Sequence, residues 1–162
     1  MKKIVVFGNS GSGKSTLAKQ LATEFELPSL DLDILAWQAT QPPVRKPLDE
    51  SSSLINAFVG KHQHWVVEGC YADLLSLIID KADEVIFLNP GVETCIENCR
   101  ARPWESHKYS SIEEQNNNLD MLLDWVKQYS SREDEFSLTS HQALFDGFEG
   151  NKTEYNSNFR HS

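Results

Sequence analysis

The chain has 162 residues, which suits one compact domain with a core of its own. It carries 24 Asp and Glu against 15 Lys and Arg, and the formal charge of −9 argues against a general nucleic-acid binder, which needs a basic face. No apolar run approaches the length of a membrane span, and the first residues predict a core strand rather than a signal sequence. We therefore expect a cytoplasmic protein without a membrane partner, as a monomer or a homodimer.

Strand and helix patterns alternate along the first 100 residues. A β-branched, apolar run over residues 2–7 predicts a strand, and residues 16–22 predict the helix that follows it. The stretch 37–47 is rich in proline and predicts no regular element. The other elements expected in this part are a strand at 27–33, a helix at 48–60, a strand at 64–68, a helix at 71–81, a strand at 84–88 and a helix that carries Cys95 and Cys99.

The pattern changes after residue 100. Residues 100–111 are polar and aromatic without a period, and residues 112–130 then predict a long helix with leucines at helical spacing. Residues 141–145 predict a last strand, and residues 153–162 predict a polar C-terminal tail. Apolar strands that alternate with helices are typical of an α/β fold with a mostly parallel sheet covered on both faces. We expect a single domain over residues 1–152.

Residues 8–15 read Gly-Asn-Ser-Gly-Ser-Gly-Lys-Ser, a full match to the phosphate-binding loop pattern G-x-x-x-x-G-K-[ST]. The strand before the loop and the helix after it are the context that this motif needs. Glycines let successive amides turn toward phosphate oxygens, and the helix N-terminus adds a partial positive charge. The residues of this loop expected to bind the nucleotide are Gly8, Asn9, Ser10, Gly11, Ser12, Gly13, Lys14, Ser15 and Thr16.

Two side chains of the loop have specific expected roles. Lys14 is expected to reach the β- and γ-phosphates, and the Ser15 hydroxyl is expected to bind Mg²⁺. The alternative is a glycine-rich turn without a ligand, which the flanking strand and helix disfavour. The sequence therefore predicts that the protein binds ATP together with Mg²⁺.

Acidic residues follow two strands, at the edge where open α/β sheets bind their ligands. Asp31 and Asp33 end the second expected strand, and Glu68 ends the third. Phosphoryl transfer needs a carboxylate that orients or deprotonates the acceptor hydroxyl, and Asp33 is our first candidate for this base. Asp31 is expected to hold a water of the Mg²⁺ shell, while Glu68 competes for either role. The alternative is that one of them caps a loop or pairs with an arginine.

Arginines flank the irregular segment 100–111. Arg100 and Arg102 begin it, and Arg132 follows the helix behind it. Arginines on a mobile flap can close over a triphosphate and neutralise the charge that develops on the transferred group. The alternative is a solvated surface arginine. We predict that residues 100–111 form a lid, because no apolar period fixes them to the core.

Other residues near these motifs have two interpretations each. Trp37 and Arg45 follow the acidic strand, where an acceptor is recognised, although Trp37 equally fits a core position. Gly69 marks either a close approach of substrate or a simple turn. Cys95 and Cys99 share one helical stripe and are most simply buried and reduced, although a metal site with His107 is conceivable.

These motifs resemble a known family. The phosphate loop at 8–16, the strand ends at 30–33 and 67–69, and the arginines at 100 and 102 resemble the adenylate-kinase and shikimate-kinase branch of P-loop proteins. More closely, residues 32–33 with 37–38, and residues 65–69 with Tyr71, resemble the adenylate-kinase-like proteins labelled DNA-topology-modulation (flagellar-regulator) proteins. The resemblance covers most of the chain, to about residue 152, and its most specific part is the phosphate loop.

The resemblance implies a three-layer fold with a five-stranded parallel sheet in the order 2-3-1-4-5 and a short lid. It also implies that a loop near Asn151 and Lys152, after the last strand, faces adenine. The phosphate loop ends in Lys-Ser-Thr, as in small-metabolite kinases, rather than in the Lys-Gly-Thr of adenylate kinases. Shikimate kinases have three glycines after strand three, where this chain has Glu68-Gly69-Cys70, so shikimate itself is not implied as the acceptor.

We expect a phosphotransferase that moves the γ-phosphate of ATP to a small-molecule acceptor, either a nucleotide or a hydroxylated metabolite. The alternative is a regulatory nucleotide-binding protein that hydrolyses ATP slowly and acts through a protein partner. The acidic strand ends and the arginine-flanked segment favour the kinase, because a pure switch needs no acceptor pocket.

Overall fold

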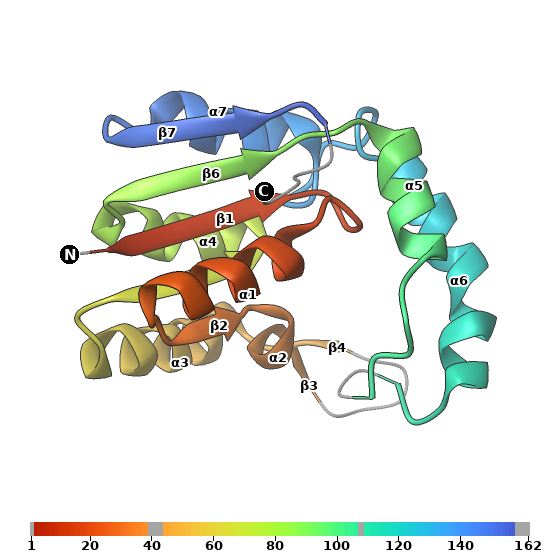
Figure 1. Cartoon of the computed structure of the whole chain (residues 1–162), viewed down its shortest axis with the longest axis horizontal. Coiled ribbons are helices and arrows are strands. Elements are labelled where there is room, and N and C mark those ends of the chain that lie inside the picture. Colours follow the sequence, from red (N-terminus) through yellow and green to blue (C-terminus); the bar gives the residue numbers. More distant parts are fainter. Residues whose placement is uncertain (1, 39–43, 107–108, 158–162) are drawn as a thin grey trace.

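The computed structural model describes residues 2–38, 44–106 and 109–157 (Figure 1). Its centre is a parallel sheet of five strands in the order β2-β5-β1-β6-β7. When only these five strands are counted along the chain, the order is 2-3-1-4-5, as predicted. The strands are β1 (Lys3–Gly8), β2 (Ser29–Asp31), β5 (Trp65–Gly69), β6 (Glu84–Leu88) and β7 (Asn151–Tyr155).

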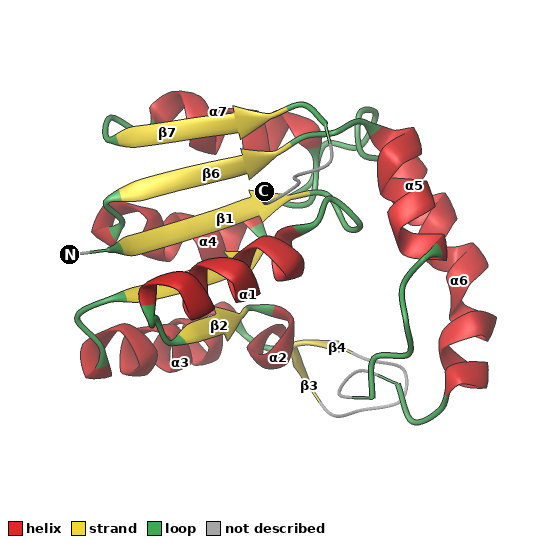
Figure 2. Ribbon diagram, in the orientation of Figure 1, coloured by secondary structure: helices red, strands yellow, loops and turns green. Residues whose placement is uncertain are grey.

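Helices cover both faces of this sheet, which gives the predicted three layers (Figure 2). Alternate side chains of a strand point to opposite faces, so Ile4 and Val6 pack with Leu17 on one side while Val5 and Phe7 pack on the other. Full burial of each such side chain stabilises the fold by about 1.5–3 kcal/mol. One face carries α1 (Lys14–Phe25), and the other carries α3 (Leu48–Lys61), α4 (Ala72–Ile78) with the 3₁₀ turn η1 (Ile79–Lys81), and α7 (Leu138–Gly147).

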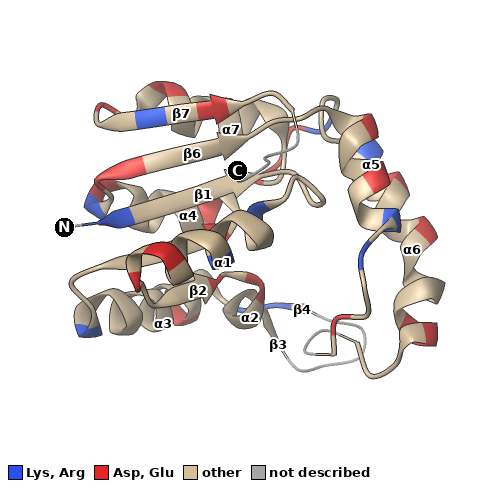
Figure 3. Cartoon of the chain, in the orientation of Figure 1, with Lys and Arg blue, Asp and Glu red and all other residues tan. Residues whose placement is uncertain are grey.

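Two further helices stand beyond the carboxyl ends of the strands, α5 (Val92–Arg100) and α6 (Ile112–Lys127) (Figure 1). They pack on each other through a small core that includes Cys95, Cys99 and Leu123. Acidic residues outnumber basic ones along both helices, as Figure 3 shows. Within the described ranges, no helix is both long and apolar enough to cross a membrane.

The end of the chain differs from the sequence prediction. Residues 141–145 lie in helix α7 rather than in a strand, and the Ser137 side chain caps that helix by accepting a hydrogen bond from the backbone N–H of Ser140. The fifth strand is β7, which continues to Tyr155 and so enters the segment predicted as a polar tail. β7 is polar because it is an edge strand, with Asn151, Lys152 and Thr153 exposed.

The region after β2 also contains more regular structure than predicted. The strand predicted at 27–33 is shorter, and the four-residue helix α2 (Asp33–Ala36) follows it. The strands β3 (Trp37–Gln38) and β4 (Val44–Arg45) then pair antiparallel, where the prolines predicted no regular element. Two of these prolines, Pro42 and Pro43, lie outside the described residues.

Candidate active site

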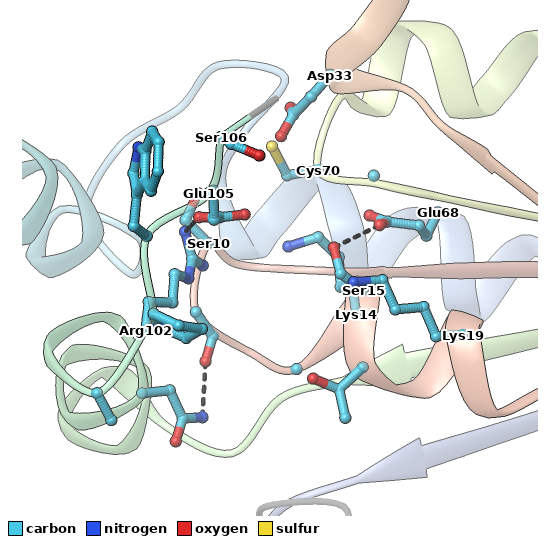
Figure 4. Close-up of a pocket in the computed structure, with 18 residues that line it drawn as sticks. Ser10, Lys14, Ser15, Lys19, Asp33, Glu68, Cys70, Arg102, Glu105 and Ser106 are labelled. Carbon is cyan, nitrogen blue, oxygen red and sulfur yellow. Dashed lines mark hydrogen bonds and ion pairs between the residues drawn. The ribbon is translucent and has the colours of Figure 1, made fainter. Parts of the chain in front are cut away.

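A cavity of about 520 Å³ lies at the carboxyl edge of the sheet (Figure 4). Asp33, Cys70 and Glu68 lie on one side of it, and Arg102 and Glu105 lie on the other. Since the five strands of the central sheet are parallel, their carboxyl ends meet here, which is where open α/β sheets bind ligands. The lining consists of Ser10, Gly11, Gly13, Lys14, Ser15, Thr16, Lys19, Asp33, Glu68, Gly69, Cys70, Asn98, Ala101, Arg102, Pro103, Trp104, Glu105 and Ser106.

The loop between β1 and α1 has the backbone conformation that phosphate binding requires. Gly11 and Gly13 have φ values of 81° and 97°, in the left-handed region that favours glycine. A Cβ at Gly11 would overlap the Cys95 carbonyl oxygen and the Cys99 Sγ, so only glycine fits against α5. Gly13 lies at the N-terminus of α1 without a side-chain cap, which leaves the first amides of the helix for a ligand. Ser12 Oγ is buried and has no hydrogen-bond partner among the described residues.

The loop is held by a hydrogen bond from Lys14 and by hydrogen bonds with α5 and α6. Lys14 Nζ donates to the Asn9 carbonyl oxygen at 2.8 Å, so the ammonium group lies across the loop. Asn98 Nδ2 on α5 donates to the Gly11 carbonyl oxygen at 2.8 Å, and Asn9 Nδ2 donates to the Val126 carbonyl oxygen at 3.3 Å. Asn98 was not among the predicted site residues, because nothing near it in the sequence points to the loop.

Glu68 at the end of β5 is buried directly beside the loop. Ser15 Oγ donates a hydrogen bond to Glu68 Oε2 at 2.6 Å. Burial raises the pKa of Glu68 to about 7, and the nearby charge of Asp31 adds to this effect, while Lys14 and the Ser15 hydrogen bond oppose it. Asp31 is the register partner of Glu68 across the sheet. Glu68 therefore faces the loop hydroxyl predicted to bind Mg²⁺.

The oxygens of Ser15, Asp31 and Glu68 fit Mg²⁺. All three residues line a smaller cavity of about 180 Å³ that adjoins the first. In the described ranges, no group of three or more His, Cys, Asp or Glu could hold a metal ion. Mg²⁺ in phosphoryl-transfer sites needs no such cage, because it is bound by one or two carboxylates together with substrate phosphates and water. Two carboxylates and a hydroxyl beside a phosphate loop match that ligand set.

Asp33, at the start of α2, lines the same cavity as Glu68. Its backbone N–H donates to Asp31 Oδ1 at 2.9 Å, which fixes the turn between β2 and α2. Its carboxylate accepts a hydrogen bond from the hydroxyl of Tyr71. Tyr71 in turn accepts a hydrogen bond at 2.8 Å from Trp37 Nε1. Tyr71 is part of the family resemblance, but the sequence predicts no role for it.

Trp37 and Arg45 were predicted to recognise the acceptor, and the structure places both outside the lining of the cavity. Arg45 forms ion pairs with Asp73 at 3.1 Å and with Glu135 at 3.3 Å. Its guanidinium carbon lies 4.8 Å from the centre of the Tyr71 ring. Their bonding partners are therefore other side chains of this chain, which no local sequence pattern could reveal.

The three predicted arginines of the lid separate into different environments. Arg102 lines the cavity and lies 3.5 Å from Glu105. Arg100 is exposed on the last turn of α5, outside the cavity lining. Arg132 is also outside it, because it pairs with Asp134 at 2.6 Å and packs over the Trp125 ring. The prediction of a site role for Arg132 is not supported by this position.

The predicted lid is an irregular segment between α5 and α6, of which residues 101–106 and 109–111 are described. Trp104 and Glu105, which were not predicted as site residues, line the cavity. The Gln115 side chain on α6 bonds the segment twice, donating to the Pro103 carbonyl at 3.0 Å and accepting from the Glu105 N–H at 2.8 Å. His107 and Lys108 lie outside the described residues. Closure of this segment stays a prediction.

The predicted adenine contact of Asn151 and Lys152 is wrong in its structural basis. Both residues begin β7 rather than follow it, and Asn151 is the register partner of Glu84 at the start of β6. This is the amino edge of the sheet, opposite the phosphate loop, whose Gly8 pairs with Leu88 at the other end of β6. Lys152 Nζ instead donates to the Phe145 carbonyl oxygen at 3.1 Å.

Cys95 and Cys99 are buried free cysteines beneath the phosphate loop, as their helical stripe predicted. Burial raises the pKa of both thiols, to about 11 for Cys95. The thiols therefore stay protonated near neutral pH and pack as small apolar groups.

Comparison with known proteins gives matches to shikimate kinases, and no family model matches the chain. A shikimate kinase from Flavobacterium psychrophilum is 28% identical over 118 residues, which span 62% of this chain and 66% of that protein. The crystal structure of shikimate kinase from Bacteroides thetaiotaomicron aligns with a TM-score of 0.58 and 16% identity, over 97% of this chain and 87% of that one. Shikimate kinase from Acinetobacter baumannii in complex with shikimate aligns with a TM-score of 0.45 and 14% identity, over 89% of this chain and 91% of that one.

The fold is thus that of shikimate kinase. Together with the sequence match, it supports a relation to the small P-loop kinases of the shikimate-kinase and adenylate-kinase type, which use ATP.

Proposed function

We propose that the protein transfers the γ-phosphate of ATP to a small-molecule acceptor, with Mg²⁺. The observation that carries this proposal is a single cavity that joins the phosphate loop to two carboxylates, Asp33 and Glu68. A protein that only senses ATP needs the loop but not further carboxylates beside it in the same cavity. Shikimate, the acceptor named for the relatives, is one candidate among hydroxylated metabolites and nucleotides. The finer assignment to the DNA-topology-modulation type rests on the sequence resemblance alone.

In this proposal, the loop amides and Lys14 bind and orient the phosphates of ATP. Ser15, Asp31 and Glu68 hold Mg²⁺, which when bound neutralises charge on the β- and γ-phosphates. We assign Glu68 to the Mg²⁺ site rather than to the acceptor, because its carboxylate already accepts a hydrogen bond from Ser15. Asp33 is left to face the acceptor, where it accepts the proton of the attacking hydroxyl. Arg102 stabilises the charge on the transferred group, which forms a new O–P bond to the acceptor as its bond to ADP breaks.

The test is incubation with γ-labelled ATP and a panel of acceptors that includes shikimate, other hydroxylated metabolites and nucleotides. We expect label in an organic product with the wild type. Asp33→Asn should bind ATP as the wild type does and keep only a small residual rate of transfer, and Lys61→Ala, on the exposed end of α3, should match the wild type in both. If label is found only in inorganic phosphate with every acceptor, the regulatory alternative replaces this proposal.

A further inference from the structure

Asp33 is connected to a chain of hydrogen bonds whose direction is determined by the donors available. Trp37 Nε1 can only donate, so the Tyr71 oxygen must accept there, at 2.8 Å. The single proton of the Tyr71 hydroxyl is then left to donate to Asp33 Oδ1. An ionised carboxylate only accepts, so this arrangement suits the charged form of Asp33 and orients that oxygen.

The Tyr71 ring that provides this bond is itself fixed. Tyr71 is buried, with 3% of its surface exposed, and its ring meets Phe136 edge-on at 5.2 Å between centroids. The guanidinium of Arg45 lies over the ring, between the carboxylates of Asp73 and Glu135. The ring is therefore enclosed by an aromatic edge and by a cation that two anions hold in place.

The backbone around Tyr71 is anchored to the same elements. Tyr71 immediately precedes α4, and the N–H of Ala72 donates to the Glu135 carbonyl oxygen at 2.9 Å. Asp73, two residues after Tyr71, is one of the two ion-pair partners of Arg45. Glu135 therefore binds both the backbone after Tyr71 and the arginine over its ring. Contacts with the backbone after Tyr71 and with its ring therefore both restrict movement of the tyrosine hydroxyl.

We propose that Tyr71 is a positioning residue, which holds the carboxylate of Asp33 in the orientation that meets the acceptor hydroxyl. Trp37 and Arg45 support it by fixing the hydroxyl and the ring of Tyr71. This inference rests on the proposed function, because it assigns to Asp33 the contact with the acceptor. It also gives Trp37 and Arg45 a role in acceptor turnover without any contact with the acceptor.

A double-mutant cycle tests the proposal. Tyr71→Phe keeps the ring and removes the hydroxyl, and it should lower kcat/KM for the acceptor by about 100-fold, the effect of a reacting group misplaced by about 1 Å. The Kd for ATP, measured by calorimetry, should stay within twofold. In an Asp33→Ala background, Tyr71→Phe should have no further effect on transfer, because Tyr71 acts through the missing carboxylate.

Tyr129→Phe is the matched control. Its hydroxyl is also buried and bonded, to His141 Nδ1 at 2.7 Å, but Tyr129 lies outside the cavity lining. Any effect of Tyr129→Phe should be the same with and without Asp33. If Tyr71→Phe likewise slows both backgrounds equally, Tyr71 is only structural and the proposal is overturned.

A second measurement separates this inference from the proposed function. Crystal structures of the wild type and of Tyr71→Phe with ADP should show the Asp33 carboxylate in one position in the wild type, and displaced or in several positions in the variant. An unmoved Asp33 in the variant overturns the positioning role, whatever the activity. If the wild type transfers phosphate to no acceptor while Asp33 still moves in the variant, the proposed function fails and the positioning of Asp33 stands.

Discussion

The phosphate loop and Asp33 border the same cavity. The loop and the wall behind Asp33, which consists of Tyr71, Trp37 and Arg45, are built in opposite ways. In the loop, polar groups lack protein partners among the described residues: Ser12 Oγ is buried without a hydrogen bond, and the N-terminus of α1 has no side-chain cap. In the wall, Arg45 has two carboxylate partners, and Tyr71 both accepts and donates a hydrogen bond. The comparison indicates that the loop is made to meet an anion, while the wall is made to hold one carboxylate still.

Lys14 gives the largest expected effect on the loop side. Lys14→Ala removes the point charge from the phosphates and should lower transfer by about 1,000-fold, as expected for a group that stabilises transition-state charge. The fold should be unchanged, because within the described part of the chain the Lys14 Nζ hydrogen bond goes to the Asn9 carbonyl oxygen of the same loop. Calorimetry should show weaker ATP binding than for the wild type and for the Lys61→Ala control. Equal ATP affinity for Lys14→Ala and the wild type would remove the loop from the proposed site.

The same contrast explains how much of the molecule could be predicted from its sequence. The loop is predictable because its function depends on consecutive residues, and β1 and β6 are predictable because their apolar runs are long and buried. β7 could not be predicted, since Asn151–Tyr155 is polar and becomes a strand only by pairing with β6. Residues 141–145 end in Ala-Leu-Phe, a short apolar run like that of a strand, but the Ser137 cap and the burial of one helical face make them part of α7.

The wall was predictable only in its residue types. The sequence indicated that Asp33, Trp37 and Arg45 belong near the acceptor, but their partners lie far away along the chain. Tyr71 is 38 positions from Asp33, and Glu135 is 90 positions from Arg45. Such pairs depend on the tertiary arrangement of α4 and the segment before α7, and they cannot be predicted from the periodicity of the sequence.

Arg102 gives the next largest effect. It tests whether the segment 100–111 acts together with the phosphate loop on the transferred phosphate. Arg102→Ala should lower kcat by about 100-fold while the Kd for ATP changes only a few-fold, because the contact forms with charge that develops during transfer. Arg100→Ala is the matched control, since Arg100 is exposed outside the cavity lining, and it should stay within about twofold of the wild type. Steady-state kinetics with both variants decides the point. A larger effect from Arg100 would contradict the assignment.

The pH dependence of stability tests how the buried His141 supports the backbone next to Tyr71. Its Nε2 donates to the Cys70 carbonyl oxygen at 2.8 Å, next to Tyr71, and its Nδ1 accepts from the Tyr129 hydroxyl. Burial lowers the pKa of His141 to about 4. The unfolded chain takes up this proton near pH 6.5, so acidification through that range favours unfolding until the folded ring also protonates near 4.

Stability should therefore be complete above about pH 6.5 and decrease between 6.5 and 4. From pH 7 to 4.5, the wild type should lose about 2 kcal/mol more free energy of unfolding than His141→Gln, which cannot titrate. Urea denaturation at the two pH values measures this difference. Equal losses in the two proteins would show that the ring is not held neutral by the fold.

Arg45 gives the smallest expected effect and the most direct test of the contrast between the two regions. Arg45→Met should reduce the free energy of unfolding by about 1 kcal/mol, because Asp73 and Glu135 lose their partner, but all three side chains are between 23% and 37% exposed and water screens the loss. The Kd for ATP should not change, and the KM for the acceptor should change less than about threefold, since Arg45 acts on Tyr71 and does not line the cavity.

Lys46→Met removes the same charge one residue away and is the control for a general electrostatic effect. If Arg45→Met raises the acceptor KM tenfold or more at unchanged stability, and Lys46→Met does not, Arg45 binds the acceptor directly, as its sequence position first predicted. The wall would then resemble the loop in presenting a cation to its ligand, and the two ion pairs with Asp73 and Glu135 would have to open when the acceptor binds.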